Sequence, residues 1–362
     1  MASVAGIEVR LDPSWFIVLL LVSWGLASQF FPWRVPGLSL WIYWGAGLLT
    51  GILFFVCVLF HELAHSLVSI HAGIPVPRIT LFVFGGVSEI SREPEDAATE
   101  FKIAIAGPLV SFGLWLLFFW LALACKGAPI VCAGIEALRN INLILLIFNL
   151  VPGFPLDGGR VLRAALWTVW GDFRRATYWA CFGGRMLAWL LMITGFFGFL
   201  GGHIMSGLWQ VLIGLFLLQA AEAAYAQAVL REGMRGMSVA EAMKREVVAV
   251  PAGATVAELV DGYFLKHHYA GYPVLDGENV LGVVALADVK EIPREDWGEA
   301  TAAEVAVKIP AESMPGPGDP ISRALELMSE LGVGRLPVVE DGRLVGIVTS
   351  GDIMTLLHLR GE

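Results

Sequence analysis

Residues 54–73 read FFVCVLFHELAHSLVSIHAG, and they place two histidines and a glutamate inside a segment apolar enough to cross a bilayer. On a helix, His61 and His65 lie four residues apart and project from one face, with their Cβ atoms about 5–6 Å apart, so both imidazoles can bind one metal ion. Glu62 points about 100° away from His61 and stands beside the two ligands, where it can act on a water molecule. This spacing predicts a zinc hydrolase.

The surroundings of the motif strengthen this interpretation. No Asp, Glu, Lys or Arg occurs in residues 35–60, the 26 residues before His61. A charged side chain inside hydrocarbon costs several kcal/mol, so a buried glutamate with two histidines requires partners, and a divalent cation satisfies all three. We interpret His71, beside Ala72 and Gly73, as an interfacial histidine rather than a ligand.

The composition divides the chain into two parts. Of the 362 residues, 57% are hydrophobic, and residues 1–236 carry 14 Lys and Arg against 13 Asp and Glu. Residues 237–362 carry 10 Lys and Arg against 20 Asp and Glu. An apolar membrane part is therefore followed by an acidic, soluble part, and the negative charge of the soluble part argues against nucleic acid as a partner.

Uncharged runs locate the membrane spans, because a span needs about 20 apolar residues. The last of these runs, 186–221, contains GFLGGHIMSG and is interpreted as parts of two helices joined near Gly201–His203. The sequence predicts six spans, at 13–32, 41–71, 100–124, 134–152, 176–200 and 204–230.

The basic residues of the connecting loops predict the orientation of the spans. One side receives only Arg34 and Lys126. We therefore predict that both termini are cytoplasmic, on the side that holds Arg10, Arg78, Arg92, Lys102, Arg160, Arg163, Arg174, Arg175, Arg231 and Arg235.

The cysteines do not form a metal motif. Cys57, Cys125, Cys132 and Cys181 lie in or beside spans and have no Cys-x-x-Cys spacing. Cys125 and Cys132 flank the second non-cytoplasmic loop, and the sequence leaves open whether they form a disulfide.

A second motif supplies a candidate third metal ligand. Residues 149–160 read NLVPGFPLDGGR, and Asp157 follows 17 uncharged residues. Pro152 and Pro155 interrupt a helix, and two glycines after the aspartate permit backbone angles that other residues avoid. We expect a non-helical segment near membrane depth, which requires cover from protein or from a water-filled cavity. A catalytic zinc site typically has three protein ligands, although a helix end with an interfacial aspartate fits this motif equally well.

These two motifs, in this order and inside spans, resemble those of the site-2 protease family of intramembrane zinc metalloproteases, and the resemblance covers residues 1–230. LFVFGGVSEI (81–90) is similar to the membrane-associated β-hairpin of the family, and AGPLVSF (106–112) is similar to its Gly-Pro element. The family often has Asn where this chain has Ser111.

The resemblance implies roles for individual residues. His61, His65 and Asp157 would hold one Zn²⁺ per chain, and Glu62 would be the general base and then the general acid in peptide hydrolysis. Asn149 would contact the substrate backbone or the oxyanion. The apolar alternation around Gly85 and Gly86 would offer a strand edge to an unwound substrate.

The acidic part contains an internal repeat. Residues 250–292 and 314–356 align so that Pro273 matches Pro337, Gly282 matches Gly346, and Asp288 matches Asp352. A fixed spacing of this kind indicates duplication, and the two units resemble a tandem pair of CBS domains. We expect SVAEAMKREVVAV (238–250) to supply the entry helix of the first unit.

The resemblance to CBS domains implies a site for an adenine nucleotide. The second unit has the ribose-contacting pattern in Gly346, Thr349 and Asp352, whereas the first unit keeps Asp288 but has Ala285 in place of the threonine. We expect one competent site, in the second unit, or none. A pair that serves only as a homodimerisation module is the alternative.

The expected fold class is a polytopic α-helical membrane protein of six spans with a membrane-associated β-hairpin, followed by a soluble α/β CBS pair. The expected domains are a protease domain over 1–232 and CBS units over 237–295 and 302–362. The expected function is zinc-dependent endopeptidase activity in the cell membrane on membrane-spanning protein substrates, with control by nucleotide as a hypothesis. The alternatives are a CBS-regulated transporter or channel, whose intramembrane His, Glu and Asp would carry ions, and a non-catalytic family member.

Overall fold

The computed structural model describes residues 2–4, 6–83, 85–89 and 94–361, and these form two compact units, Met1–Ala228 and Val229–Glu362. Arg92, which the orientation argument uses, lies outside the described residues, as do Phe84 and Ile90 of the expected hairpin.

The six predicted spans are confirmed among the described residues, where six helices are long and apolar enough to cross a membrane. The first span, Pro13–Arg34, consists of α1 (Pro13–Gly25), a π-helical turn (Leu26–Phe30) and α2 (Phe31–Arg34). The fourth helix begins at Pro129, five residues before the predicted start, because proline is well suited to the first turn of a helix. The other spans are α3 (Leu40–His71), α4 (Ala97–Ala124), α5 (Pro129–Asn149), α7 (Phe173–Leu200) and α8 (Ile204–Met234).

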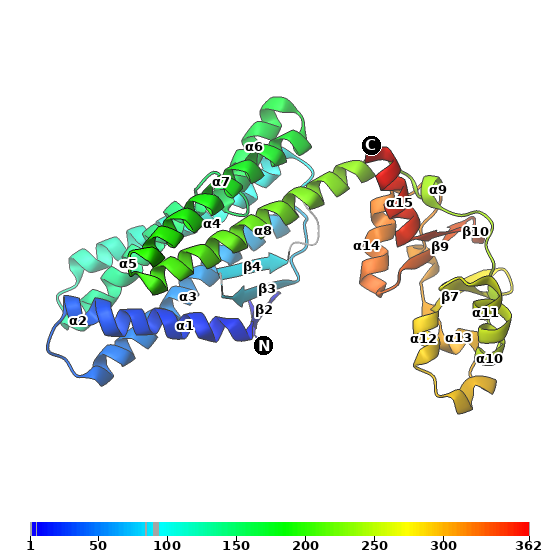
Figure 1. The fold of residues 1–362 in the computed structure, drawn as a ribbon, viewed down its shortest axis with the longest axis horizontal. Coiled ribbons are helices and arrows are strands. Elements are labelled where there is room, and N and C mark those ends of the chain that lie inside the picture. Colours follow the sequence, from blue (N-terminus) through cyan, green and yellow to red (C-terminus); the bar gives the residue numbers. More distant parts are fainter. Residues whose placement is uncertain (1, 5, 84, 90–93, 362) are drawn as a thin grey trace. The chain divides into compact units, whose positions relative to one another are not determined.

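The packing of the helices brings distant segments of the chain together (Figure 1). Helix α3 packs against α1, α4 and α5, and a shorter helix, α6 (Asp157–Trp170), packs between α4 and α7. Helix α6 is not among the candidate spans. Its first residue is Asp157, so the break after α5 delivers this carboxylate to the side of α3.

A four-stranded sheet lies beside α1 and α3, and it is larger than the expected hairpin. Strands β3 (Arg78–Phe82) and β4 (Gly85–Glu89) form the hairpin, with Phe82 opposite Gly85 and Leu81 opposite Gly86. The sheet order is β1-β2-β3-β4, in which β2 (Ile7–Leu11) pairs parallel to β3, and β1 (Ala2–Val4) pairs antiparallel to β2. Strand β4 is therefore an edge strand.

The second unit contains the predicted repeat. In each repeat two antiparallel strands precede a helix, and equivalent residues lie 64 positions apart: Gly282 pairs with Val274, and Gly346 pairs with Val338. The first repeat contains β5 (Val250–Pro251), α10 (Val256–Leu259), a π-helical turn (Val260–Phe264), α11 (Leu265–His267), β6 (Gly271–Asp276), β7 (Asn279–Ala285) and α12 (Leu286–Lys290). A 3₁₀ turn (Arg294–Gly298), α13 (Ala302–Val305), β8 (Val307–Lys308) and a second 3₁₀ turn (Ala311–Ser313) lead to the second repeat, which contains α14 (Ile321–Leu331), β9 (Arg335–Glu340), β10 (Arg343–Thr349) and α15 (Ser350–Gly361).

The entry segments of the two repeats exchange places, which differs from our expectation for 238–250. Helix α9 (Val239–Ala242) packs into the core of the second repeat, where Val239 joins Leu336 and Val338. Helix α13, which precedes the second repeat in sequence, packs into the core of the first repeat through Ala302. Lys244, which follows α9, exchanges two backbone hydrogen bonds with Ile347 of β10: each N–H donates to the carbonyl oxygen of the other residue, at 2.8 and 2.9 Å. The register of these short segments is set by a distant strand, so their sequence order did not reveal the exchange.

The cysteine question is resolved in the structure. Cys125 and Cys132 form a disulfide across the connection between α4 and α5, and Cys57 and Cys181 are free and buried.

Candidate metal centre

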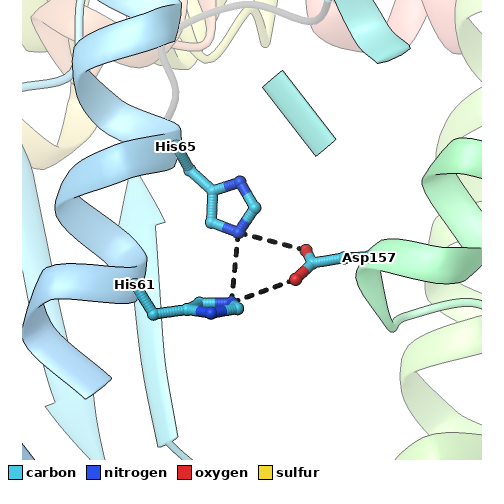
Figure 2. Close-up of side chains that lie close together, drawn as sticks. All are labelled: His61, His65 and Asp157. Atoms are coloured by element: carbon cyan, nitrogen blue, oxygen red, sulfur yellow. Dashed lines mark hydrogen bonds and ion pairs between the residues drawn. The ribbon is translucent and has the colours of Figure 1, made fainter. Parts of the chain in front are cut away.

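Three side chains from two distant parts of the chain converge on one point (Figure 2). His61 and His65 project from α3, and Asp157 projects from the first turn of α6. His61 Nε2 lies 3.0 Å from Asp157 Oδ2, His65 Nε2 lies 3.3 Å from Asp157 Oδ1, and the two Nε2 atoms are 3.2 Å apart. Among the described residues, these are the only three His, Cys, Asp or Glu side chains whose ligand atoms lie within 4.8 Å of one another.

Helix α4 holds the opposite nitrogen of each imidazole. His65 Nδ1 lies 2.6 Å from the carbonyl oxygen of Ile103, which can only accept a hydrogen bond, so Nδ1 carries the proton and Nε2 presents a lone pair. His61 Nδ1 lies 2.9 Å from the hydroxyl of Ser111, which gives this ring the same orientation. Partners of this kind fix the tautomer and the ring plane of metal-binding histidines.

The donor set fits zinc. In a tetrahedral zinc site with bonds of about 2.0–2.2 Å, neighbouring ligand atoms lie roughly 3.3 Å apart, which agrees with the distances among the three side chains. With neutral imidazoles and an ionised carboxylate, the converging atoms are all hydrogen-bond acceptors, and a cation satisfies them together. Two nitrogens and a carboxylate oxygen are common zinc ligands, and three protein ligands leave a fourth position for the reaction.

Residues 150–156, just before Asp157, are non-helical, as predicted, but helix α6 begins at Asp157 itself, and the two glycines that follow serve a different purpose from the one expected. Gly158 and Gly159 belong to α6, and neither has a positive φ angle. A Cβ at Gly158 would lie 2.3 Å from the carbonyl oxygen of Leu150, and one at Gly159 would lie 2.3 Å from the carbonyl carbon of Gly153. Glycine is required because the first turn of α6 packs directly on the backbone of the preceding loop.

Strand β4 fixes the position of Glu62. The Ser88 hydroxyl donates a hydrogen bond of 3.1 Å to Glu62 Oε2, and Ser66 Oγ lies 3.1 Å from Ser88 Oγ. A Cβ at Gly86 would lie 2.4 Å from Glu62 Cγ. The carboxylate is therefore held between α3 and β4, and its Oε1 accepts no side-chain hydrogen bond within the part of the chain that the structure describes.

His61, His65, Asp157 and Glu62 border one cavity of about 440 Å³ with mostly apolar walls. Asn149, at the end of α5, lines this cavity, as do Gly85 and Gly86. Arg160, one turn after Asp157 on α6, supplies a positive charge to the same lining. Aromatic walls come from α3, β3, α5 and α8, in Phe54, Phe55, Phe82, Phe148, Trp209 and Phe216.

Sequence reasoning did not assign roles to Ser88, Ser111 and Arg160. The sequence marks Ser111 only as a departure from the Asn of the family. Its position in an otherwise apolar helix, where a hydroxyl requires a partner, is the signal that could have identified it. Arg160 closes the quoted motif NLVPGFPLDGGR, and its i, i+3 relation to Asp157 could have placed both on one face.

Of the residues predicted to bind a nucleotide, Thr349 and Asp352 of the second repeat lie in contact with each other. Thr349 Oγ1 donates to Asp352 Oδ2 at 2.7 Å, and Lys244 Nζ lies 2.9 Å from Asp352 Oδ1. Burial raises the pKa of Asp352, but the hydrogen bonds from Lys244 and Thr349 outweigh it, so this pKa lies below its ordinary value. Gly346 packs against Met243, whose sulfur would lie 2.8 Å from a Cβ added at Gly346. In the first repeat, Asp288 accepts a hydrogen bond of 2.7 Å from the backbone N–H of Ala285.

The fold and the centre together define a class of protein. A polytopic helical bundle with a His-His-Asp centre and an adjacent glutamate is the architecture of a membrane-embedded zinc metalloprotease. Comparison with known proteins supports this class and narrows it to one family.

The family model for peptidase family M50 matches residues 49–140 and 130–192, and the CBS domain model matches residues 239–295 and 316–359. Rip3 of Mycobacterium tuberculosis is 33% identical over 364 residues, which cover 99% of this chain and 92% of Rip3. Zinc metalloprotease MJ0392 of Methanocaldococcus jannaschii is 31% identical over 368 residues, which cover 99% of this chain and 96% of that protein. The solved structure of a site-2 protease from Methanocaldococcus jannaschii is 31% identical, covers 62% of this chain and 94% of its own, and has a TM-score of 0.45.

The chain belongs to the site-2 protease family, peptidase family M50, and carries a tandem pair of CBS domains. It is a multi-pass membrane zinc metalloprotease.

Proposed function

We propose that this metalloprotease hydrolyses peptide bonds within or beside transmembrane segments of membrane-protein substrates, with His61, His65 and Asp157 as zinc ligands and Glu62 as the general base. The observation that carries the proposal is the convergence of the three ligand atoms beside Glu62, at one cavity between membrane-spanning helices. A centre closed by side chains from α3 and α6 suits a catalytic site better than an ion path, which would need a series of sites along the membrane.

The protein side chains divide the chemistry among them. Zinc, when bound, supplies Lewis-acid polarisation of the scissile carbonyl and lowers the pKa of water. Glu62 accepts the proton of the attacking water on its Oε1 and transfers it to the nitrogen of the leaving amine. The hydrogen bond from Ser88 to Oε2 keeps the carboxylate aimed during both transfers. The Asn149 amide, which lines the same cavity, donates to the substrate backbone or to the developing oxyanion.

The central test separates the base from the ligands. Glu62→Gln should abolish cleavage of a model transmembrane substrate and leave about one zinc per chain, because the base is lost and the ligands remain. Asp157→Ala should lower the zinc content, because it removes a ligand. Proteolysis retained by Glu62→Gln would refute the assigned base, and transport of ions without proteolysis would favour the transporter reading.

We infer further that the substrate binds as an extended strand along β4. A helical substrate hides its peptide groups in hydrogen bonds, so it must unwind before cleavage. Strand β4 is an edge of the sheet, and its residues Gly85–Ser88 line the cavity beside Glu62. An edge strand offers unpaired backbone groups to an incoming chain.

Proline scanning of β4 tests this binding mode. Val87→Pro should reduce cleavage at unchanged zinc content, because proline removes a backbone N–H, whereas Val87→Ala keeps the amide and should reduce cleavage less. Equal cleavage by both variants would argue against strand addition.

We propose the domain boundaries expected from the sequence, with a protease domain over 1–232 and CBS units over 237–295 and 302–362.

We also propose that the CBS pair controls the protease through an adenine nucleotide. Support comes from Thr349 and Asp352, which lie together where the ribose hydroxyls would bind, and from the start of α15, where backbone N–H groups can face phosphate. Purified full-length enzyme should change its cleavage rate on addition of ATP, ADP or AMP, and Asp352→Asn should lose that response. A rate that no nucleotide changes would leave the pair as a dimerisation module, which size measurement of the detergent-solubilised protein would show.

We also propose that both termini face the cytoplasm. The basic residues of the loops support this orientation, and so does the disulfide between Cys125 and Cys132, since disulfides persist in oxidising compartments. After reduction of intact cells, a membrane-impermeant thiol reagent should label Cys132, and it should not label a cysteine introduced at Arg235. The reverse labelling pattern would invert the orientation.

A further inference from the structure

Helix α4 supplies no metal ligand, yet four of its residues face the candidate metal centre or the helix that carries Asp157. Glu100, Ile103, Gly107 and Ser111 follow one another at intervals of three, four and four residues, and this spacing places them on one face of the helix. All four are buried, and Glu100, Ile103 and Ser111 have no exposed surface.

Three of these residues contact the histidines. The Ile103 carbonyl and the Ser111 hydroxyl hold the Nδ1 atoms of His65 and His61, at 2.6 and 2.9 Å. Gly107 lies between these two residues in sequence and approaches the Nε2 atoms of both rings. A Cβ on Gly107 would lie 2.2 Å from His65 Nε2 and 2.6 Å from His61 Nε2, the two atoms that face Asp157. The α4 backbone at Gly107 therefore lies directly against the ligand atoms and leaves no room for a side chain.

The fourth residue connects α4 to the helix of the third ligand. Arg163, on α6, donates to Glu100 Oε1 through Nε at 2.7 Å and through Nη2, and both side chains are buried. The Arg163 guanidinium also lies 4.6 Å from the Phe154 ring centroid and 4.8 Å from that of Phe173. These contacts fix α6, and with it Asp157, relative to the face of α4 that holds both histidines.

We propose that this face of α4 (Glu100, Ile103, Gly107 and Ser111), the α4 template, positions all three metal ligands, with Gly107 and Ser111 as positioning residues for the histidines. The inference rests on the metal centre of the proposed function and adds to it the element that sets the geometry of that centre. Supporting groups on a rigid helix hold a site more closely than groups on a loop do, and loss of such a partner typically costs 10–100-fold in metal affinity.

A pair of alanine variants tests Gly107. In full-length protein in detergent, Gly107→Ala should weaken Zn²⁺ binding at least about 10-fold in competition with a chelator, in line with the usual loss for a displaced ligand partner. It should also change the visible absorption spectrum of the Co²⁺-substituted protein, because the added methyl overlaps the ligand nitrogens. Gly113→Ala is the matched control on the same helix, because nothing lies within 4 Å of a Cβ at that position. It should bind both ions as the wild type does.

A second pair tests Ser111. Ser111→Ala should weaken Zn²⁺ binding by about 10–100-fold and alter the Co²⁺ spectrum, because His61 loses the partner that orients it. Ser111→Thr keeps the hydroxyl and should recover most of the affinity. Wild-type affinity and an unchanged spectrum in Gly107→Ala or in Ser111→Ala would overturn the template, while the wild-type zinc content and Glu62→Gln results would stand. A wild-type protein that binds no zinc would instead defeat the proposed function.

Discussion

Gly86 shows how closely a single residue of the sheet approaches the proposed base. Its Cα lies against the Glu62 side chain, so a methyl group there would have to displace the carboxylate or the strand. Atoms of the proposed ligands His61, His65 and Asp157 are not among the three nearest that a Cβ at Gly86 would meet. The positions of the base and of the ligands can therefore be changed separately.

We predict that Gly86→Ala lowers kcat/KM by at least about 100-fold, since a displacement of about 1 Å in a catalytic group costs this much. Zinc content should stay at about one per chain, by metal analysis of the purified protein. Ser88→Ala removes the hydrogen bond to Glu62 without adding volume, so it should reduce activity less. Full activity in Gly86→Ala would show that Glu62 does not need its observed position.

Between elements, Glu100 and Arg163 form a buried ion pair that joins α4 to α6, and Arg160 Nε lies 3.9 Å from the same Glu100 oxygen. Breaking a buried ion pair leaves an uncompensated charge and costs about 3–5 kcal/mol, whereas replacing both partners by apolar residues is often neutral. We predict that Glu100→Leu lowers the free energy of unfolding in detergent by about this amount, and that Glu100→Leu with Arg163→Met recovers most of it.

The Arg34–Glu136 pair is the comparison. Its atoms lie 2.7 Å apart, but the Arg34 side chain is 49% exposed, so Arg34→Met should cost about 0–1 kcal/mol. If the double variant of Glu100 and Arg163 is as unstable as Glu100→Leu, the loss of stability comes from the missing ion pair and not from an unpaired Arg163 charge.

The loop between α5 and α6 depends on a second helix contact, with α7. The Phe154 N–H donates to the carbonyl oxygen of Ala180 at 3.0 Å, and a Cβ at Gly184 would lie 1.8 Å from the carbonyl oxygen of Phe154. The carbonyl oxygen of Phe154 belongs to the backbone and cannot rotate away as a side chain could, so the loop has to move if Gly184 gains a side chain.

We predict that Gly184→Ala shifts the loop and lowers zinc occupancy well below one per chain, because Asp157 follows that loop directly. Gly198→Ala on the same helix is the control, since its nearest non-local atom is 3.8 Å away. Normal zinc content in Gly184→Ala would mean that α6 holds Asp157 without the help of the loop.

Over the longest range in the chain, the exchanged entry segments join the two CBS repeats. Val283 of the first repeat shares a core with Leu336 and Val338 of the second, and α9 joins that core. Helix α9, which precedes the first repeat in sequence, completes the core of the second repeat, and α13, which precedes the second repeat, completes the core of the first.

We predict that Leu336→Ala, at a site with no exposed surface, lowers the free energy of unfolding of this unit by about 2–5 kcal/mol. Amide hydrogen exchange should rise in β6 and β7 as well as in β9 and β10, because Val283 of β7 belongs to the core that Leu336 helps to form, and β6 pairs with β7. Faster exchange confined to the second repeat would show that they unfold independently.

The sequence predicted the spans because a bilayer imposes length and apolarity on each one, and the two repeats because duplication leaves a fixed spacing. It did not predict β2, although Ile7, Val9 and Leu11 alternate with polar residues as in a strand. The partner of β2 is β3, and such a distant pairing has no local signature. Ser111 and Gly107 were missed as supports of the centre for the same reason, because their importance depends on side chains about 50 residues away.

The parallel pairing of β2 with β3 constrains when the sheet can form during synthesis. Residues Glu8–Leu11 pair with Arg78–Leu81, so β2 can pair only with β1 until the chain of the first two spans has been made. The edge that lies beside Glu62 is therefore built only after membrane insertion is well advanced, and in a nascent chain stopped before residue 78 the side of β2 that later pairs with β3 would stay unpaired.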